Sequence, residues 1–91
     1  MRTVTFELVQ RWLKGICHDD RVNLTEDTKF STLSWDDNSK YSKSDFGLLL
    51  FNFEVKFDID GNYDYDQFMD GWENMTIRDC IKKIQDIIDR Q

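Results

Sequence analysis

Four stretches of this chain repeat apolar residues at intervals of three and four positions, which is the spacing of one face of an α-helix. The clearest stripe follows Thr76 and Asp79, whose separation is typical of a helix capping pair. The pattern therefore predicts a helix from about Thr76 onward. Its apolar positions are Ile77, Cys80, Ile81, Ile84, Ile87 and Ile88.

Two more helices are predicted earlier in the chain. The first covers residues of about 3–17, and the second covers about 42–57 and begins with the capping pair Ser42 and Asp45. Their apolar positions are Val4, Phe6, Leu8, Val9, Trp12, Leu13 and Ile16 in the first, and Phe46, Leu49, Leu50, Phe53 and Phe57 in the second.

A buried strand from Leu48 to Phe57 is the competing interpretation of the second stretch, because short apolar runs occur in both kinds of element. The capping pair before it and the placement of Glu54 and Lys56 favour the helix.

The remaining segments are rich in polar residues that interrupt the helical pattern. Residues 18–40 predict a long ordered loop, and a short third helix is expected to end near Gly71 or Trp72. At 91 residues the chain has room for one core, so residues 1–91 are expected to form a single all-α domain. The expected loop anchors are Val22, Leu24, Phe30, Leu33 and Trp35, and the third helix contains Tyr65, Phe68, Met69 and Trp72.

Composition excludes several classes of function. The formal charge of -6 repels nucleic-acid phosphates and anionic membranes, so neither is an expected partner. The expected partner is a protein with a basic surface. The first residues lack the apolar run of a signal peptide, which favours a cytoplasmic location. Cys17 and Cys80 both fall on apolar helix faces, where a cytoplasmic pair stays reduced.

Three short segments together resemble the acyl carrier protein family. They are Leu24-Thr-Glu-Asp-Thr-Lys-Phe30, Phe53-Glu-Val-Lys-Phe-Asp-Ile59 and Thr76-Ile-Arg-Asp-Cys-Ile81, which follow the order of that family's first loop, second-helix end and fourth-helix start. The resemblance implies a small four-helix bundle of acyl-carrier-protein type, with a long first loop and a short third helix.

The family attaches phosphopantetheine to a serine in an Asp-Ser-Leu tripeptide at the start of its second helix. Counting forward from the loop places Asp37 at that position, and counting back from Phe57 places Lys43 there. The resemblance therefore extends to the serine-less carrier-like proteins of unknown function that bacteria encode, and no cofactor is expected. The nearby serines are Ser39, Ser42 and Ser44, none of which lies between Asp and Leu.

Metal and catalytic sites have little support. The run Asp58–Asp66 begins like an EF-hand calcium loop, but Tyr63 replaces the required glycine and Met69 replaces the closing glutamate. The cluster Cys17–Asp20 lacks enough further ligands for zinc. Because His18 is the sole histidine, no catalytic triad is indicated, and we expect a protein that is not an enzyme.

The most distinctive surface signal is a run of six acidic residues and no basic one between Lys56 and Arg78. Charge steers encounter and desolvated aromatic side chains supply affinity, so this segment predicts a partner-binding surface. The open alternative is that Tyr65, Phe68 and Trp72 belong to the core. The predicted binding residues are Asp58, Asp60, Tyr63, Asp64, Tyr65, Asp66, Asp70 and Trp72, with Trp35, Asp36 and Asp37 in the long loop as a further candidate.

Two functions of different class fit these observations. One is a non-catalytic, acidic, acyl-carrier-like module that binds a protein through its second-helix to third-helix face, which the resemblance implies. The other is an immunity protein that neutralises a basic bacterial toxin such as a nuclease, by analogy of size and charge. A functional acyl carrier protein is a lesser alternative.

Overall fold

The computed structural model describes residues 3–17, 23–33, 41–61 and 63–91. These residues contain four α-helices and two 3-10 turns, and no strand beyond a single bridge between Lys29 and Thr76. The all-α prediction is confirmed, and a strand over residues 48–57 is excluded. The elements are α1 (Phe6–Cys17), η1 (Phe30–Thr32), α2 (Lys43–Phe57), α3 (Tyr65–Met69), η2 (Trp72–Asn74) and α4 (Ile77–Asp89).

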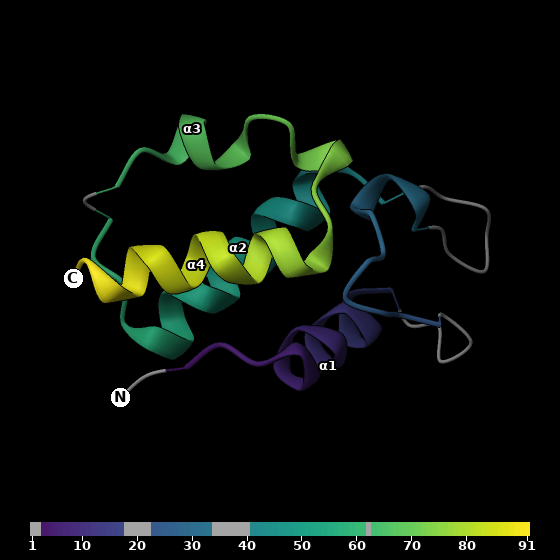
Figure 1. Ribbon diagram of the computed structural model, residues 1–91, viewed down its shortest axis with the longest axis horizontal. Coiled ribbons are helices and arrows are strands. Elements are labelled where there is room, and N and C mark those ends of the chain that lie inside the picture. Colours follow the sequence, from purple (N-terminus) through teal and green to yellow (C-terminus); the bar gives the residue numbers. More distant parts are fainter. Residues whose placement is uncertain (1–2, 18–22, 34–40, 62) are drawn as a thin grey trace.

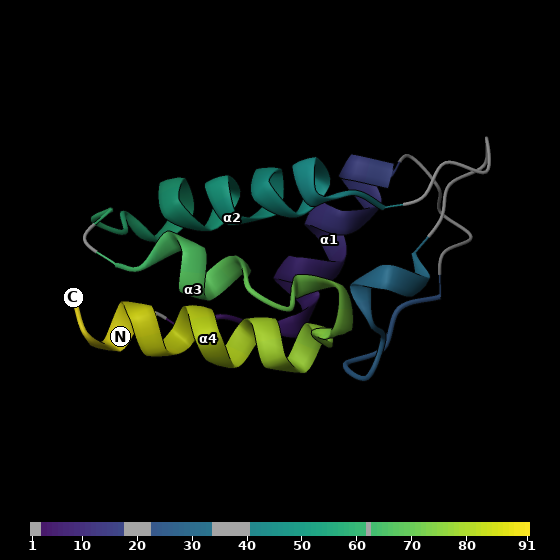
Figure 2. The same cartoon turned by 90° about the horizontal axis from the view of Figure 1, so that it is seen from above.

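Helices α2 and α4 run in roughly the same direction and form the long axis of the molecule (Figures 1 and 2). The short α3 lies over one side of this pair, and α1 lies on the opposite side (Figure 1). Figure 2 shows α2 at the margin of the bundle, with its outer side turned away from α3 and α4. Among the described residues, no helix is long and apolar enough to cross a membrane.

The two predicted capping pairs form complete capping boxes. At α2, the Asp45 amide donates to Ser42 Oγ at 3.3 Å, and the Ser42 amide donates to Asp45 Oδ2 at 2.9 Å. At α4, Asp79 and Thr76 repeat this exchange at 3.1 and 3.2 Å. Each box pairs amides that a helix start leaves without internal partners, which explains why α2 and α4 begin where the sequence predicts.

Two predicted boundaries are wrong by a few residues. Helix α1 begins at Phe6 instead of residue 3, because Val4 lies before the helix, where its side chain is buried and its amide donates to Gln85 Oε1 at 2.9 Å. Helix α3 ends at Met69 instead of continuing to Gly71 or Trp72. Asp70 leaves helical geometry with ψ 128°, and Gly71, in the left-handed region at φ 72°, then starts the separate turn η2.

The first loop is joined to the start of α4 by backbone hydrogen bonds. The Phe30 amide donates to the Met75 carbonyl at 3.2 Å, and the Ile77 amide donates to the Thr28 carbonyl at 3.0 Å. Arg78 adds side-chain ion pairs with Glu26 and Asp27. The predicted anchors Leu24, Phe30 and Leu33 are all buried, and Val22 and Trp35 lie outside the described residues.

Aromatic rings fill the core beneath α3 and η2. The Phe46 ring lies 4.9 Å from Phe30, edge to face, and stacks at 5.7 Å on both Phe68 and Trp72. At the other end of α2, Phe53 meets Trp12 of α1 at 5.0 Å. Offset and edge-to-face pairs at these distances are favourable, so the rings connect the first loop and three helices in one core.

Candidate functional site

Five of the predicted binding residues line one open hollow at the edge of α3. They are Asp64, Tyr65, Asp66, Asp70 and Trp72, and the acidic Glu73 and the basic Lys43 also line the hollow. Asp64 is held by its role as N-cap of α3, where its side chain accepts the Gln67 amide at 3.0 Å. We call the four exposed acids of this hollow, Asp64, Asp66, Asp70 and Glu73, the acidic rim.

The other predicted residues lie apart from the rim. Asp58 ends α2 at φ 52°, and the Asp60 amide donates to Gln91 Oε1 at 2.8 Å at the far end of α4. The structure therefore divides the predicted acidic segment between two places. Trp35, Asp36 and Asp37 lie outside the described residues.

Tyr63 has a structural contact that the sequence does not indicate. Its hydroxyl donates to Glu54 Oε1 on α2, and burial together with this bond raises the Tyr63 pKa above its ordinary value. Tyr63 therefore links the acidic segment to α2.

The aromatic residues of the segment differ in their exposure, so the open question between core and surface has a separate answer for each one. Phe68 is buried against Phe46, and Trp72 is half-buried because its ring stacks on Phe46. The Tyr65 side chain is 47% exposed. Tyr65 is therefore the aromatic residue of this group that is available to a partner.

A second surface, which sequence analysis missed, lies on the outer side of α2. Leu48, Phe51 and Val55 are 48%, 56% and 66% exposed, although all three are apolar. They recur at intervals of three and four, so they form one row on the helix surface. We call this row the apolar stripe. Large apolar side chains gathered on an exposed face are characteristic of interaction sites.

The sequence did contain a signal for this stripe. A surface helix normally concentrates its apolar residues on one side, as α1 and α4 do. The α2 sequence KSDFGLLLFNFEVKF instead has apolar residues on two opposite sides of the helix. The core covers one side, which is formed by Phe46, Leu49, Leu50, Phe53 and Phe57, and leaves the stripe on the other.

Tyr65 lies between the stripe and the rim. The Tyr65 side chain reaches toward α2, and a Cβ atom added at Gly47 would lie 3.8 Å from the Tyr65 hydroxyl. Gly47 directly precedes Leu48 and lies one turn before Phe51. Tyr65 also lines the acidic hollow, so the apolar and acidic surfaces adjoin along the α2–α3 contact.

The net charge of the protein is concentrated in this part of the chain. Residues 42–73 contain eight acidic and two basic residues, which accounts for the entire formal charge of -6. The other residues carry ten acidic and ten basic side chains and are balanced. The electrostatic field of the protein is thus strongest around α2 and α3.

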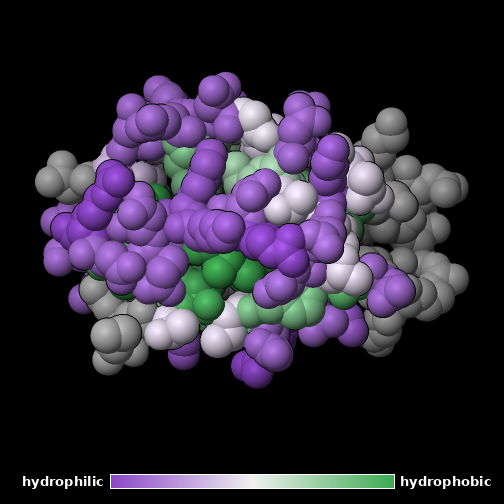
Figure 3. Space-filling model, in the orientation of Figure 1, coloured by the Kyte–Doolittle hydropathy of each residue, from purple (hydrophilic) through white to green (hydrophobic). Residues whose placement is uncertain are grey.

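The face shown in Figure 3 has a different character. It is mostly hydrophilic, with an apolar band along the junction of α4 and the N-terminal part of the chain. Hydrophobic residues of both elements, including Phe6, Leu8 and Ile81, are partly buried against the core. This band continues the core outward, whereas the stripe on α2 faces away from it.

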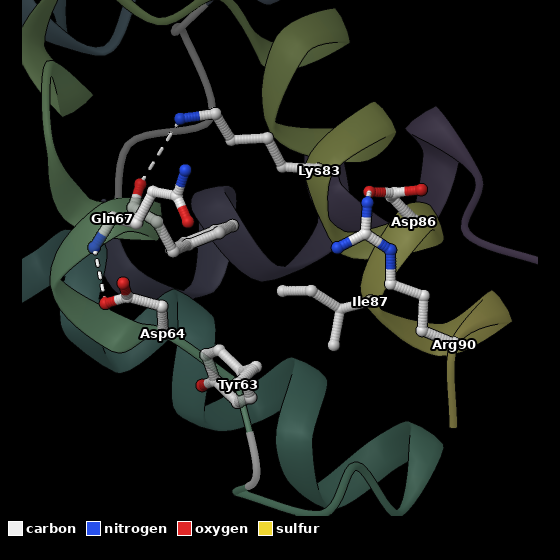
Figure 4. Close-up of a pocket in the computed structure, with 8 residues that line it drawn as sticks. Tyr63, Asp64, Gln67, Lys83, Asp86, Ile87 and Arg90 are labelled. Atoms are coloured by element: carbon white, nitrogen blue, oxygen red, sulfur yellow. Dashed lines mark hydrogen bonds and ion pairs between the residues drawn. The ribbon is translucent and has the colours of Figure 1, made fainter.

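A hollow of about 270 Å³ separates α3 from α4 (Figure 4). Its charged groups already have partners: Arg90 pairs with Asp86 at 2.9 Å, and Lys83 Nζ donates to the Phe68 carbonyl at 3.5 Å. Tyr63 and Ile87 form its apolar wall. Asp64, which also lines this hollow, accepts the Gln67 amide, so the charged groups of the hollow are bonded within the protein.

Reactive groups are sparse in the part of the chain that the structure describes. No three side chains of His, Cys, Asp or Glu converge there to hold a metal ion. The Cys80 thiol is buried, and burial raises the pKa of Cys80 to about 12, which keeps it protonated at neutral pH. Cys80 is thus a packing residue of the core.

Comparison of the chain with protein-family models, curated proteins and solved structures found no match. Its function must therefore be inferred from its own contacts, exposure and charge.

Proposed function

We propose that this protein is a non-catalytic binding module that docks on a protein with a basic surface through its α2–α3 face. The observation that carries the proposal is the apolar stripe on α2, which lies within residues 42–73, the segment that accounts for the whole net charge. Apolar side chains supply affinity when they are desolvated, and surrounding acids accelerate the encounter with a basic partner.

Capture from cells in which the protein naturally occurs tests this function. The wild-type chain is compared with Phe51→Ala/Val55→Ala, because alanine favours helix and both positions are exposed. The control is Lys82→Ala, which removes a large exposed side chain from α4. We expect a protein with a basic contact surface to be retained by wild type and control and lost from the double variant. Equal capture by all three would contradict the proposal.

The resemblance to acyl carrier proteins supports the choice of this face, and we propose that the chain lacks the phosphopantetheine arm. Ser42, one of the three serines near the expected position, has its hydroxyl in the α2 capping box, where it also donates to Asp45 Oδ2 at 3.1 Å. Ser44 is exposed in the first turn of α2, and Ser39 lies outside the described residues.

Intact-mass spectrometry tests the absence of the arm. After incubation with coenzyme A and a broad-specificity phosphopantetheinyl transferase, we expect an unchanged mass, because no serine has the Asp-Ser-Leu context. A conventional acyl carrier protein in the same reaction is the positive control. A pantetheine adduct on Ser39, Ser42 or Ser44 would instead support the carrier function.

Inhibition of a basic toxin is the second candidate, and the concentration of charge on one part of the surface favours it. The two candidates differ in the captured partner. An immunity protein would retain a nuclease or similar toxin and abolish its activity at equimolar ratio, whereas a carrier-like module would retain a protein whose activity persists in the complex.

A further inference from the structure

We propose that the partner binds this face with a single amphipathic helix whose apolar side packs along Leu48, Phe51 and Val55 and whose basic residues lie along one flank. This inference rests on the function proposed above and specifies the chemistry of the contact. It follows from the shape of the stripe, from the charges beside it and from the elements available for pairing.

The shape of the stripe fits a helix. From Leu48 to Val55 the row spans about 10 Å along α2, and its spacing of three and four creates the ridges and grooves into which a second helix packs. A helix brings its backbone hydrogen bonds with it. A partner segment that binds by strand addition would need a sheet edge, and the described residues contain none.

The charge around the stripe is asymmetric. On one side lies α3 with the acidic rim, in a segment that has six acidic residues and no basic one between Lys56 and Arg78. On the other side lies α1, which contacts α2 through Trp12 and Phe53 and contains one acidic and two basic residues. Among the described residues the excess of acidic side chains thus lies on the α3 side, so basic residues on that flank of a docked helix gain the larger electrostatic attraction.

A second copy of this chain fits the surface poorly. Each copy would bring the same acidic segment to the contact, which opposes association. The stripe consists of three partly covered side chains, so little apolar contact is available to offset that repulsion. The partly covered row suits one short helix of another protein.

A pair of synthetic peptides tests the inference with the full-length protein. The probe is a fluorescent helical peptide with leucines at intervals of three and four and lysines along one flank. One control peptide replaces every lysine by glutamate, and another has the composition of the probe in an order without helical periodicity. Fluorescence anisotropy measures binding at low and high salt.

We expect saturable binding of the probe and at least about tenfold weaker binding of both control peptides. Phe51→Ala/Val55→Ala should weaken probe binding by about tenfold or more. Asp64→Asn/Asp66→Asn should slow association at low salt by roughly tenfold and lose this effect at high salt, because rim charges act on the encounter and are screened. Asparagine also caps helices, so α3 keeps its N-cap.

The matched charge control is Asp86→Asn/Asp89→Asn, which removes two exposed acids from α4. It should leave the association rate within about twofold of wild type, since it is remote from the stripe. Circular dichroism of every variant verifies that the fold is retained. Equal binding of the glutamate peptide, or probe binding that survives the stripe variant, would overturn the inference.

Failure of the inference is distinguishable from failure of the proposed function. If cellular capture depends on the stripe but the probe does not bind, the module docks on a partner of another shape, and only the helix is refuted. Self-association in analytical ultracentrifugation that the stripe variant abolishes would assign the stripe to a second copy. Stripe-dependent binding of zwitterionic vesicles would assign it to a lipid surface, and either result refutes the helix.

Discussion

At the scale of single residues, the same residue type performs different tasks according to what packs on it. Trp72 is half-buried because its ring stacks at 5.7 Å on Phe46 and lies 5.9 Å from Tyr41. Tyr65, seven residues earlier, is 47% exposed. The first is mainly a packing residue and the second a surface residue, although both were predicted to bind a partner.

Replacing Trp72 by alanine should lower the free energy of unfolding by about 2 kcal/mol, because it removes a partly buried ring and its stacking on Phe46. Urea denaturation measures this change. Tyr65→Ala is the control and should change stability by less than about 1 kcal/mol, since its side chain is half exposed. Unaltered stability of Trp72→Ala would show that this ring contributes to binding alone.

Asp79 should make stability depend on pH in acid. The pKa of Asp79 lies below its ordinary value mainly because its carboxylate accepts a hydrogen bond from the Thr76 backbone amide, and the Thr76 side chain adds to this effect. A folded-state pKa below the unfolded one stabilises the protein above the ordinary value near 4. This contribution is lost as pH falls through the folded-state value.

Asp79→Asn should therefore destabilise the protein by roughly 0.5–1 kcal/mol at pH 7, and the difference from wild type should shrink as the pH falls below about 4. Urea midpoints at several pH values give this difference. Asp89→Asn, at the opposite end of α4, removes a negative charge from a helix C-terminus and should not destabilise. A constant Asp79 difference at all pH values would exclude the ionised cap as its source.

At the scale of elements, helix starts follow from local chemistry and helix ends from backbone geometry. Ser42 and Thr76 begin α2 and α4 through capping boxes, and the left-handed Gly71 begins η2 shortly after α3. Gly15 is also in open space, but its backbone is that of helix α1. The two glycines therefore differ in conformation and not in room for a side chain.

Alanine at these two positions should change stability in opposite directions. Gly15→Ala should raise the free energy of unfolding by about 0.5–1 kcal/mol, because alanine favours the helix and no atom lies within 4 Å of its Cβ position. Gly71→Ala should lower it by roughly 1–2 kcal/mol, because φ 72° is unfavourable for a side chain. Thermal and urea melts provide both values, and a shift of the same sign would refute the conformational explanation.

At the scale of the whole molecule, the core and the acidic surface are formed by the same part of the chain. The ring contacts from Trp12 through Phe53 and from Phe46 to Phe30 and Phe68 lie along the same helix, α2. The excess negative charge lies outside this core, on exposed carboxylates of the same part of the chain. Helix α2 thus supplies both the center of the core and the row of residues proposed for binding.

A shared core predicts that the helices unfold together. Far-ultraviolet circular dichroism, which reports helix, and tryptophan fluorescence, which reports ring packing, should give coincident urea transitions with one midpoint. Helix α1 tests this prediction most directly, because its Trp12 ring packs on Phe53 of α2 at 5.0 Å and would lose that contact if α1 separated. An early fluorescence transition would show that α1 separates from a core that α2 and α4 retain.

The sequence by itself determined the helical class, the starts of α2 and α4, and the burial of Leu24, Phe30 and Leu33 in the first loop. These features depend on periodicity, capping chemistry and isolated apolar anchors, which are local properties of the chain. The acidic character of residues 58–73 was equally evident from composition.

Only the tertiary structure decided which apolar residues face outward. Because α2 has apolar residues on two opposite sides, its own pattern does not distinguish the side of Phe46 from the side of Phe51. Exposure depends on where α1, α3 and α4 pack, and these elements leave one side of α2 uncovered. The same packing leaves Trp72 half-buried against Phe46 and brings Tyr63 to Glu54. Local periodicity does not predict such contacts, because they join different elements of the fold.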